Sequence, residues 1–356
     1  MAAPNPVAPA VASASAEVPP KRRGSPLPDD KFVKVGRCAS TGREISICYR
    51  TVGNPKDPCL LLVMGLGGCG LQWGEPLVQR FVSAGFYVVC YDNRDVGLST
   101  HLDGCPTVFI ARMVLPSWAS LGEGQPPYTL YDMAEDGMNL LTALGIEKAH
   151  ILGESMGGMI VQCMALRHPE RVKSLTIVYS HSGGPKVKPQ TFKMSLAMLR
   201  EPASNSLEDQ VNFKVQMTRL FTGDYELDEE MTRKMGLTTL SRCPEDGDGV
   251  LRQIWAVQRA KSRVKGLRNL RGIPTLIVHG MADTMVPFEN GLQLARLVDG
   301  SKLVSFARMG HSLPKDLYDD IVAEVVLQRE RGEAMHAPAS AAPSEASTFS
   351  AQEKRH

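Results

Sequence analysis

The chain has 356 residues, of which 43% are hydrophobic and 22% charged, and its formal net charge at pH 7 is +2. This length is enough for one large or two small domains with a sizeable buried core. The near-neutral charge gives no reason to expect binding to nucleic acid or to a membrane surface through bulk electrostatics. We therefore expect an ordinary globular protein.

The eight cysteines are scattered along the chain, and no two are spaced as Cys-x-x-Cys, which argues against a zinc site or a thioredoxin-type redox motif. Several fall inside apolar runs, where a free cysteine behaves as a small core residue. No apolar run is long enough to cross a bilayer, and the first residues lack the pattern of a secretory signal. We expect reduced thiols, no transmembrane segment, no metal, no cofactor and, by default, a cytoplasmic location.

The two ends of the chain differ from the middle. Residues 1–30 and 337–356 are rich in Ala, Pro and Ser and show no helical or strand period. Segments of this composition cannot bury enough apolar surface to offset the entropy of ordering them. We predict a disordered N-terminal tail over residues 1–30 and a disordered C-terminal tail over residues 337–356.

Between the tails, short β-rich runs alternate with helical patterns. KFVKVGRC and EISICYRTV flank Ser40-Thr41-Gly42 and predict a hairpin. Continuous apolar runs, as expected for strands buried on both faces, follow at 59–65, 86–92, 149–155, 174–180, 274–280 and 302–307. Helix-like stretches lie between them at 75–85, 130–145, 156–168 and 289–300. This alternation predicts an α/β fold, with a mostly parallel sheet and helices on both faces.

One long segment interrupts the alternation. Between Tyr179 and Ile273 there is almost no strand signal, only helical stretches that contain Met, Leu, Lys and Arg. Because an insertion of this size between two core strands can cover a site at the sheet edge, we predict a helical lid (cap) over residues 182–265. The core then comprises residues 31–181 and 266–330. The apolar side chains of the lid would suit a moderately apolar acyl or alcohol group, although such residues more often form the lid's own core.

A serine follows one of the predicted buried strands. In an open parallel sheet, ligands bind at the carboxyl ends of the strands, and Ser155 stands there in the pattern G-x-S-x-G, between Gly153 and Gly157. Glycines on both sides permit the sharp strand-to-helix turn that lifts a nucleophilic hydroxyl clear of the sheet. The helix expected from Met156 points its N–H groups and its positive end at the same place. The motif alone also arises by chance, so the case depends on partners for Ser155.

A nucleophilic serine needs a base, and the base needs an orienting carboxylate. Asp283 lies in the loop after the strand predicted at 274–280, and His311 lies in the loop after the strand predicted at 302–307. Of the eight histidines, His311 alone has such a place beside a candidate acid. We predict a catalytic triad in which Asp283 orients the imidazole, and His311 takes the proton of Ser155 and returns it to the leaving group.

A glycine-rich loop, MGLGG at 64–68, follows another predicted strand. Its backbone is expected to approach the developing negative oxygen closely. We assign one oxyanion-hole donor to the N–H of Leu66, with Gly67 as the alternative, and the second to the N–H of Met156. Loss of one such donor typically costs about a hundred- to a thousand-fold in rate. Gly67 and His181, which follows the strand predicted at 174–180, are candidate pocket residues, and a plain glycine-rich turn is the alternative interpretation of the loop.

Several segments together resemble the α/β-hydrolase superfamily and, more narrowly, the branch that includes aclacinomycin methylesterase. They are MGLGG (64–68), YDNRDVGLST (91–100), GESMGGM (153–159), HPERV (168–172), IPTLIVHGMAD (273–283) and MGHSLP (309–314). The resemblance covers about residues 31–325 and is weakest over 182–265. It implies hydrolysis of a small-molecule carboxylic ester through an acyl-enzyme on Ser155. Residues 93–95, typical of that branch, are interpreted as structural bracing. The anthracycline substrate is not carried over, because the matched residues form the catalytic frame and not the pocket.

Other functions of the same frame stay open. Thioesterases, lysophospholipases and amidases use the same triad, and some members of the superfamily bind small molecules with little or no turnover. Haloalkane dehalogenases and epoxide hydrolases carry an aspartate where this chain has Ser155, which excludes them. No His-Glu-x-x-His motif or Cys/His cluster supports a metal-dependent hydrolase. A complete triad with an oxyanion loop favours an enzyme over a binding protein.

Overall fold

A computed structural model describes residues 24–109, 124–244 and 246–336. The predicted C-terminal tail and residues 1–23 of the predicted N-terminal tail lie outside these ranges. Residues 24–30, which composition assigns to the tail, lie within them and pack against the folded part. The side chain of Asp30 is fully buried, with a carboxylate oxygen 2.8 Å from Nε of Arg242. Since this partner is far away in sequence, composition gives no sign of the contact.

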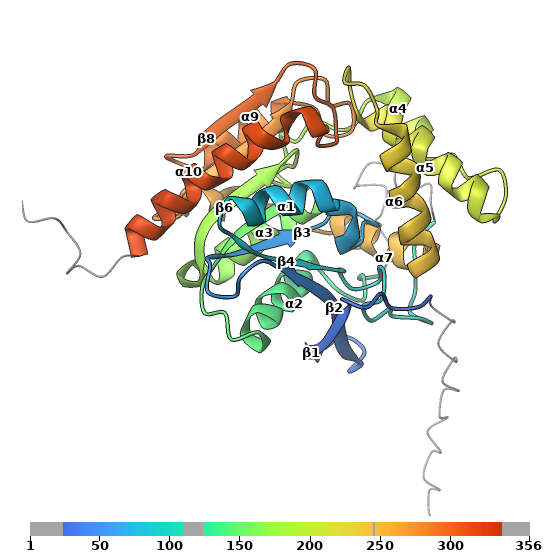
Figure 1. Cartoon of the computed structure of the whole chain (residues 1–356), viewed down its shortest axis with the longest axis horizontal. Coiled ribbons are helices and arrows are strands. Elements are labelled where there is room, and N and C mark those ends of the chain that lie inside the picture. Colours follow the sequence, from blue (N-terminus) through green and yellow to red (C-terminus); the bar gives the residue numbers. More distant parts are fainter. Residues whose placement is uncertain (1–23, 110–123, 245, 337–356) are drawn as a thin grey trace, which may run out of the picture.

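Within the described part of the chain, eight strands form one sheet in the order β1-β2-β4-β3-β5-β6-β7-β8 (Figure 1). They are β1 Lys31–Arg37, β2 Glu44–Val52, β3 Cys59–Val63, β4 Tyr87–Tyr91, β5 Ala149–Glu154, β6 Val172–Val178, β7 Thr275–Gly280 and β8 Lys302–Phe306. β2 pairs antiparallel with both β1 and β4, and the remaining pairings are parallel. The predicted hairpin and the mostly parallel sheet are confirmed.

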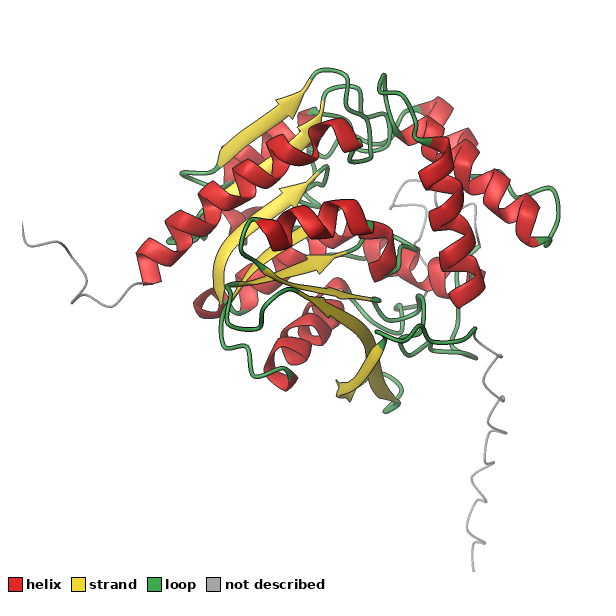
Figure 2. Ribbon diagram, in the orientation of Figure 1, coloured by secondary structure: helices red, strands yellow, loops and turns green. Residues whose placement is uncertain are grey.

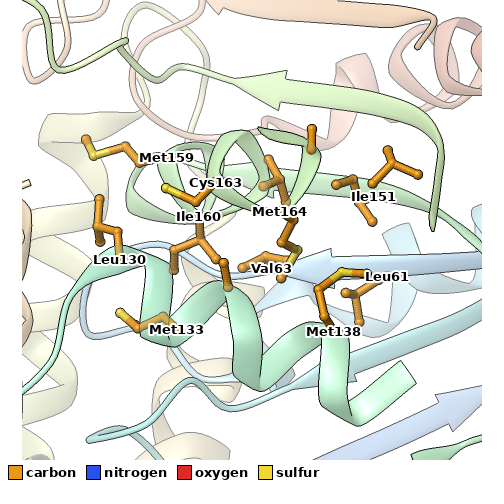
Figure 3. Close-up of a cluster of buried hydrophobic side chains, with 14 of the residues drawn as sticks. Leu61, Val63, Leu130, Met133, Met138, Ile151, Met159, Ile160, Cys163 and Met164 are labelled. Atoms are coloured by element: carbon orange, nitrogen blue, oxygen red, sulfur yellow. The ribbon is translucent and has the colours of Figure 1, made fainter. Parts of the chain in front are cut away.

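Helices cover both faces of this sheet (Figure 2). One face carries α1 Glu75–Ser83 and α10 Tyr318–His336, and the other carries α2 Leu130–Ala143, α3 Met156–Arg167, α8 Val264–Asn269 and α9 Glu289–Leu297. Because side chains alternate along a strand, Leu61 and Val63 of β3 enter the core under α2 and α3, whereas their neighbours enter the opposite core. Figure 3 shows the first core, where Met138, Ile160 and Met164 surround these two side chains.

The region predicted as a lid is helical in the part that the structure describes. Between β6 and β7 it contains α4 Phe192–Ala197, α5 Leu207–Phe221, α6 Glu229–Arg242 and α7 Gly247–Gln258, followed by α8. In Figure 1, α4, α5 and α6 stand together to one side of the sheet. The insertion therefore leaves the sheet after β6 and returns to it at β7.

The loop after β4 is braced by buried ion pairs. Arg252 on α7 donates two hydrogen bonds of 2.8 Å to Asp95, and each residue is only 1% exposed. Arg94 donates to Asp136 on α2 over 2.6 and 2.7 Å. These contacts agree with the interpretation of residues 93–95 as structural bracing, and they fix α7 to the core.

Two expectations from composition can be compared with the structure. All eight cysteines lie in the described ranges and are free, and burial raises the pKa of Cys59, Cys69 and Cys90 to about 12. These thiols are therefore protonated core residues at neutral pH. Among the described helices, none combines the length and the apolar character that crossing a bilayer requires.

Candidate active site

The carboxyl ends of β3, β5, β6, β7 and β8 lie at one edge of the sheet, because these strands are parallel neighbours. The segments after these strands carry, in the same order, Gly65, Ser155, Tyr179, Asp283 and His311. Residues that are far apart in sequence therefore meet at the edge where open parallel sheets bind ligands.

Ser155 occupies a strained turn between β5 and α3. Its φ of 52° and ψ of −118° lie in a region that residues with a side chain rarely adopt. The flanking glycines are required by close contacts. A Cβ on Gly153 would lie 2.2 Å from the carbonyl oxygen of Gly157, and one on Gly157 would lie 2.0 Å from that of Val63. The G-x-S-x-G spacing is thus a steric condition for the turn that presents the hydroxyl.

Hydrogen bonds connect Ser155, His311 and Asp283. Nε2 of His311 is 2.9 Å from Oγ of Ser155, and Nδ1 is 2.7 Å from Oδ2 of Asp283. Asp283 is 5% exposed, and its other carboxylate oxygen, Oδ1, accepts 2.8 Å bonds from the N–H groups of Met285 and Val286. Because an ionised carboxylate only accepts, Nδ1 donates to it, and Nε2 faces the serine hydroxyl as an acceptor. This is the arrangement that general-base removal of the serine proton requires.

Two aromatic rings pack against His311. The centroids of the Tyr179 ring and the imidazole are 4.6 Å apart. The ring of Phe221 on α5 makes an edge contact with the imidazole, with centroids 6.0 Å apart. Tyr179 also donates its hydroxyl to Glu154. The sequence analysis missed Tyr179, although a signal existed, because it directly follows a buried strand. Phe221 belongs to the apolar lid residues considered for the substrate, but its contact with His311 was not predicted.

Of the predicted oxyanion donors, Met156 directly follows Ser155, and Leu66 follows Gly65, which passes close to Ser155. Met156 is the first residue of α3, so its N–H has no acceptor within the helix. Gly67, the alternative to Leu66, donates its N–H to the side-chain oxygen of Gln253 on α7 at 2.9 Å. In the described ranges no acceptor takes the N–H of Leu66 or of Met156. The geometry therefore favours Leu66 over Gly67 as the donor from this loop.

A small cavity adjoins the glycine-rich loop. It measures about 40 Å³ and lies between the loops after β3 and β4 and helices α5 to α7. Its lining includes Gly67, His101, Lys214, Asp246 and Val250. Gly67, one of the two candidate pocket residues, therefore borders a cavity whose wall is mixed polar and apolar.

His181, the other candidate pocket residue, is not part of that lining. Its Nδ1 accepts the N–H of Gly183 at 3.0 Å, and its carbonyl oxygen accepts from Gln162 and Arg263. Burial, followed by the positive charge of Arg263, lowers the pKa of His181 to about 3. The imidazole is thus neutral at pH 7 and is held within its own loop, and its role in substrate binding remains a prediction.

One cluster in the described part of the chain, His101, Asp103 and Asp246, combines side chains that can ligate a metal. However, Nδ1 of His101 lies 2.8 Å from Asp246 and Nε2 lies 3.0 Å from the carbonyl oxygen of Gly97. Both ring nitrogens are therefore engaged within the protein. We interpret the cluster as a hydrogen-bonded contact that joins α7 to the core.

Comparison with known proteins identifies relatives over most of the chain. A profile of the alpha/beta hydrolase fold matches residues 58–316. Rhodomycin D methylesterase DnrP of Streptomyces peucetius is 26% identical over 306 residues, which cover 80% of this chain and 95% of that protein. A 2-hydroxy-6-oxononadienedioate/2-hydroxy-6-oxononatrienedioate hydrolase of Paraburkholderia xenovorans is 28% identical over 79% of this chain and 88% of its own length.

Solved structures show the same fold. A meta-cleavage product hydrolase from Pseudomonas fluorescens has a TM-score of 0.59 at 20% identity, covering 80% of this chain and 94% of its own. The enol-lactonase from Burkholderia xenovorans has a TM-score of 0.60 at 21% identity, covering 80% and 96%. The resemblance to the methylesterase branch and the predicted fold class are confirmed by the match to DnrP and to the family profile. The chain belongs to the alpha/beta hydrolase fold family.

Proposed function

We propose that the protein hydrolyses the carboxylic ester of a small molecule through an acyl-enzyme on Ser155. The observation that carries this proposal is the hydrogen-bond chain from Oγ of Ser155 through His311 to Asp283, with distances of 2.9 and 2.7 Å. It connects a hydroxyl to a proton acceptor whose orientation is fixed by the carboxylate of Asp283. The similarity to rhodomycin D methylesterases supports an ester as the substrate.

In the acylation step, Oγ of Ser155 attacks the carbonyl carbon of the ester while Nε2 of His311 takes the hydroxyl proton. The negative oxygen of the tetrahedral intermediate is stabilised by the N–H groups of Leu66 and Met156 and by the positive end of α3. His311 then gives its proton to the leaving alcohol oxygen as the carbon–oxygen bond breaks. Asp283 stabilises the imidazolium during both transfers.

In the deacylation step, a water molecule replaces the alcohol. Nε2 of His311 takes a proton from this water as its oxygen attacks the acyl carbon. Collapse of the second tetrahedral intermediate returns the proton to Oγ of Ser155 and releases the carboxylic acid. One ester and one water give one acid and one alcohol, and the triad returns to its starting protonation state.

The test is hydrolysis of p-nitrophenyl esters from acetate to palmitate, together with aryl methyl esters. The wild type is compared with Ser155→Ala and with Ser301→Ala, whose hydroxyl bonds to the carbonyl oxygen of Ala295 away from the site. We expect turnover in the wild type and in Ser301→Ala and none in Ser155→Ala. Equal rates in wild type and Ser155→Ala would refute the proposal.

Parallel assays separate the alternatives that share the triad. A thioester, a lysophospholipid and an anilide of the preferred acyl group are offered at equal concentration. If kcat/KM for one of these exceeds that for the ester, the substrate class moves to thioesterase, lysophospholipase or amidase. Saturable binding of an ester with no turnover identifies a binding protein instead.

A further inference from the structure

Glu154, the residue directly before Ser155, contacts two parts of the site with one carboxylate. It accepts a hydrogen bond from the hydroxyl of Tyr179, and it faces the backbone N–H of Gly65, which favours its charged form. Gly65 follows β3, Glu154 ends β5 and Tyr179 follows β6, and these strands are neighbours in the sheet. The carboxylate therefore ties together adjacent strand ends at the catalytic edge.

At one end of this linkage is the ring that packs against the catalytic imidazole. Tyr179 is 3% exposed and has a φ of 33°, a strained value for a residue with a side chain. Such a conformation persists only where surrounding contacts fix it, and the bond from its hydroxyl to Glu154 is one of those contacts. With the hydroxyl held, the ring stays 4.6 Å from His311, at 50° between planes.

At the other end is the loop that carries the oxyanion donor. A Cβ on Gly65 would lie 3.2 Å from Cβ of Ser155, so the loop passes directly beside the serine. The peptide between Met64 and Gly65 has polar partners on both sides. Its carbonyl oxygen accepts from Nδ2 of Asn93 at 3.1 Å, and its N–H faces the carboxylate of Glu154. Fixing this peptide fixes the direction of the next N–H, that of Leu66.

We propose that Glu154 is a positioning residue for the reaction, which holds Tyr179 against His311 and the oxyanion loop beside Ser155 through a single carboxylate. This inference rests on the proposed ester hydrolysis at Ser155. Its consequence is that the base and the oxyanion donor are aligned by one group that touches neither the substrate nor the reacting atoms.

The charge of Glu154 adds a second effect. Desolvation raises the pKa of this carboxyl, while the hydrogen bond from Tyr179 and the nearby His311 lower it. A carboxylate close to His311 also favours the imidazolium that forms there. Neutralising Glu154 removes this interaction, so the acid limb of kcat/KM should move to lower pH. A residue with a purely structural role would leave that limb in place.

The experiment compares Glu154→Gln with Glu333→Gln. The Glu333 carboxylate also accepts several bonds, from Lys173 at 2.8 and 2.9 Å and from His150 at 3.1 Å, but at the opposite end of β5. In Glu154→Gln we expect kcat to fall about tenfold or more with KM within about twofold, since misalignment affects the transition state more than binding. The acid limb should move to lower pH. Glu333→Gln should match the wild type in all of these values.

A second readout does not depend on finding a good ester. The rate at which a fluorophosphonate labels Ser155 reports the reactivity of the serine directly, and it should fall in Glu154→Gln in parallel with kcat. Tyr179→Phe removes the hydrogen bond to Glu154 but keeps the ring and the contact between Glu154 and Gly65, so it should lower both rates less than Glu154→Gln does. It also provides the test if Glu154→Gln does not fold.

The outcomes separate the two proposals. If Ser155→Ala abolishes hydrolysis while Glu154→Gln and Tyr179→Phe equal Glu333→Gln in kcat, acid limb and labelling rate, the positioning role is refuted and ester hydrolysis stands. If no ester is hydrolysed but Ser155 is labelled, more slowly in Glu154→Gln, the positioning role stands and the substrate is reassigned. A wild-type Ser155 that is not labelled overturns both.

Discussion

The serine, imidazole and carboxylate of the site are each held by contacts outside the triad. Gly153 and Gly157 leave room for the turn that carries Ser155, and two backbone N–H groups hold the carboxylate of Asp283. Such support is what keeps reacting groups in place without reorganisation during the reaction. The contacts also determine which substitutions should damage chemistry without damaging the fold.

Asp283→Asn is the sharpest of these. Its side-chain oxygen should keep the bonds from the N–H groups of Met285 and Val286, which turns the amide NH₂ toward Nδ1 of His311. Nδ1 then becomes the acceptor and Nε2 carries the proton, so it cannot take one from Ser155. We expect kcat to fall about ten-thousand-fold, as for the same change in other triads, with little change in melting temperature. Activity within tenfold of the wild type would contradict the assigned role.

Gln253→Leu tests the support of the oxyanion loop. The side chain of Gln253 accepts from the N–H of Gly67 at 2.9 Å and donates to the carbonyl oxygen of Arg94 at 2.9 Å. Without it, the loop can shift and the N–H of Leu66 loses its alignment. We expect kcat to drop about tenfold to a hundredfold with a smaller change in KM. A rise in KM of similar size with kcat unchanged would show that Gln253 serves substrate binding instead.

At the scale of elements, the helical insertion has two different halves. α6 and α7 are fixed to the core by buried ion pairs, including Arg242 with Asp92 at 2.9 Å and Arg252 with Asp95. α4, by contrast, exposes large apolar side chains, Phe192 at 79% and Leu196 at 52%. If the insertion moves as a lid, the movement is expected in α4.

Arg252→Ala should show how strongly α7 is held. It leaves the carboxylate of Asp95 buried without its counter-ion, a change that typically costs about 3–5 kcal/mol in the free energy of unfolding. Urea denaturation measures this. Adding Asp95→Asn removes the unpaired charge, and an asparagine tolerates the positive φ of 67° at this position. The double variant should therefore be more stable than Arg252→Ala alone; if it is less stable, the loss comes from packing and not from the charge.

Sequence patterns predicted the elements that depend on local signals. Apolar runs identified the buried strands, and the residues that follow those strands identified Ser155, Asp283 and His311 as neighbours. α10 was missed, although Ile321, Val322 and Val325 give it an apolar face. That signal was available.

Contacts across the chain could not be predicted in the same way. The bond between Gly67 and Gln253 joins residues 186 apart, and that between Asp30 and Arg242 joins residues 212 apart. No local period marks either partner, since both depend on how the insertion folds back on the core. The role of Glu154 was missed for the same reason, because only the sheet order brings Gly65 and Tyr179 to it.

For the molecule as a whole, buried neutral groups set the pH range of stability. Burial lowers the pKa of His150 to about 4 and that of His181 to about 3, from an ordinary 6.5. The unfolded chain binds these protons first, so their contribution is present above pH 6.5 and is lost as the pH falls toward 4 and 3. Burial raises the pKa of Cys59 and Cys90 from 9.0 to about 12, so their contribution is present below pH 9.0 and is lost as the pH rises toward 12.

We therefore expect the free energy of unfolding in urea to be greatest between pH 6.5 and 9.0 and to decline on both sides. His150→Gln should flatten the acid decline, by up to about 1.4 kcal/mol per pH unit for the one proton removed. If the acid decline in His150→Gln and in His181→Gln has the same slope as in the wild type, other groups cause it.

If ester hydrolysis passes through an acyl group on Ser155, that acyl group can be trapped during turnover. The protein is mixed with excess p-nitrophenyl acetate, quenched in acid during turnover and digested, and the peptides are analysed by mass spectrometry. We predict one acetyl group, on the peptide that contains Ser155, which is absent in Ser155→Ala and formed far more slowly in His311→Ala. Turnover without an acyl group on that peptide, or an acyl group that is still found on it in Ser155→Ala, would show that the reaction does not pass through Ser155.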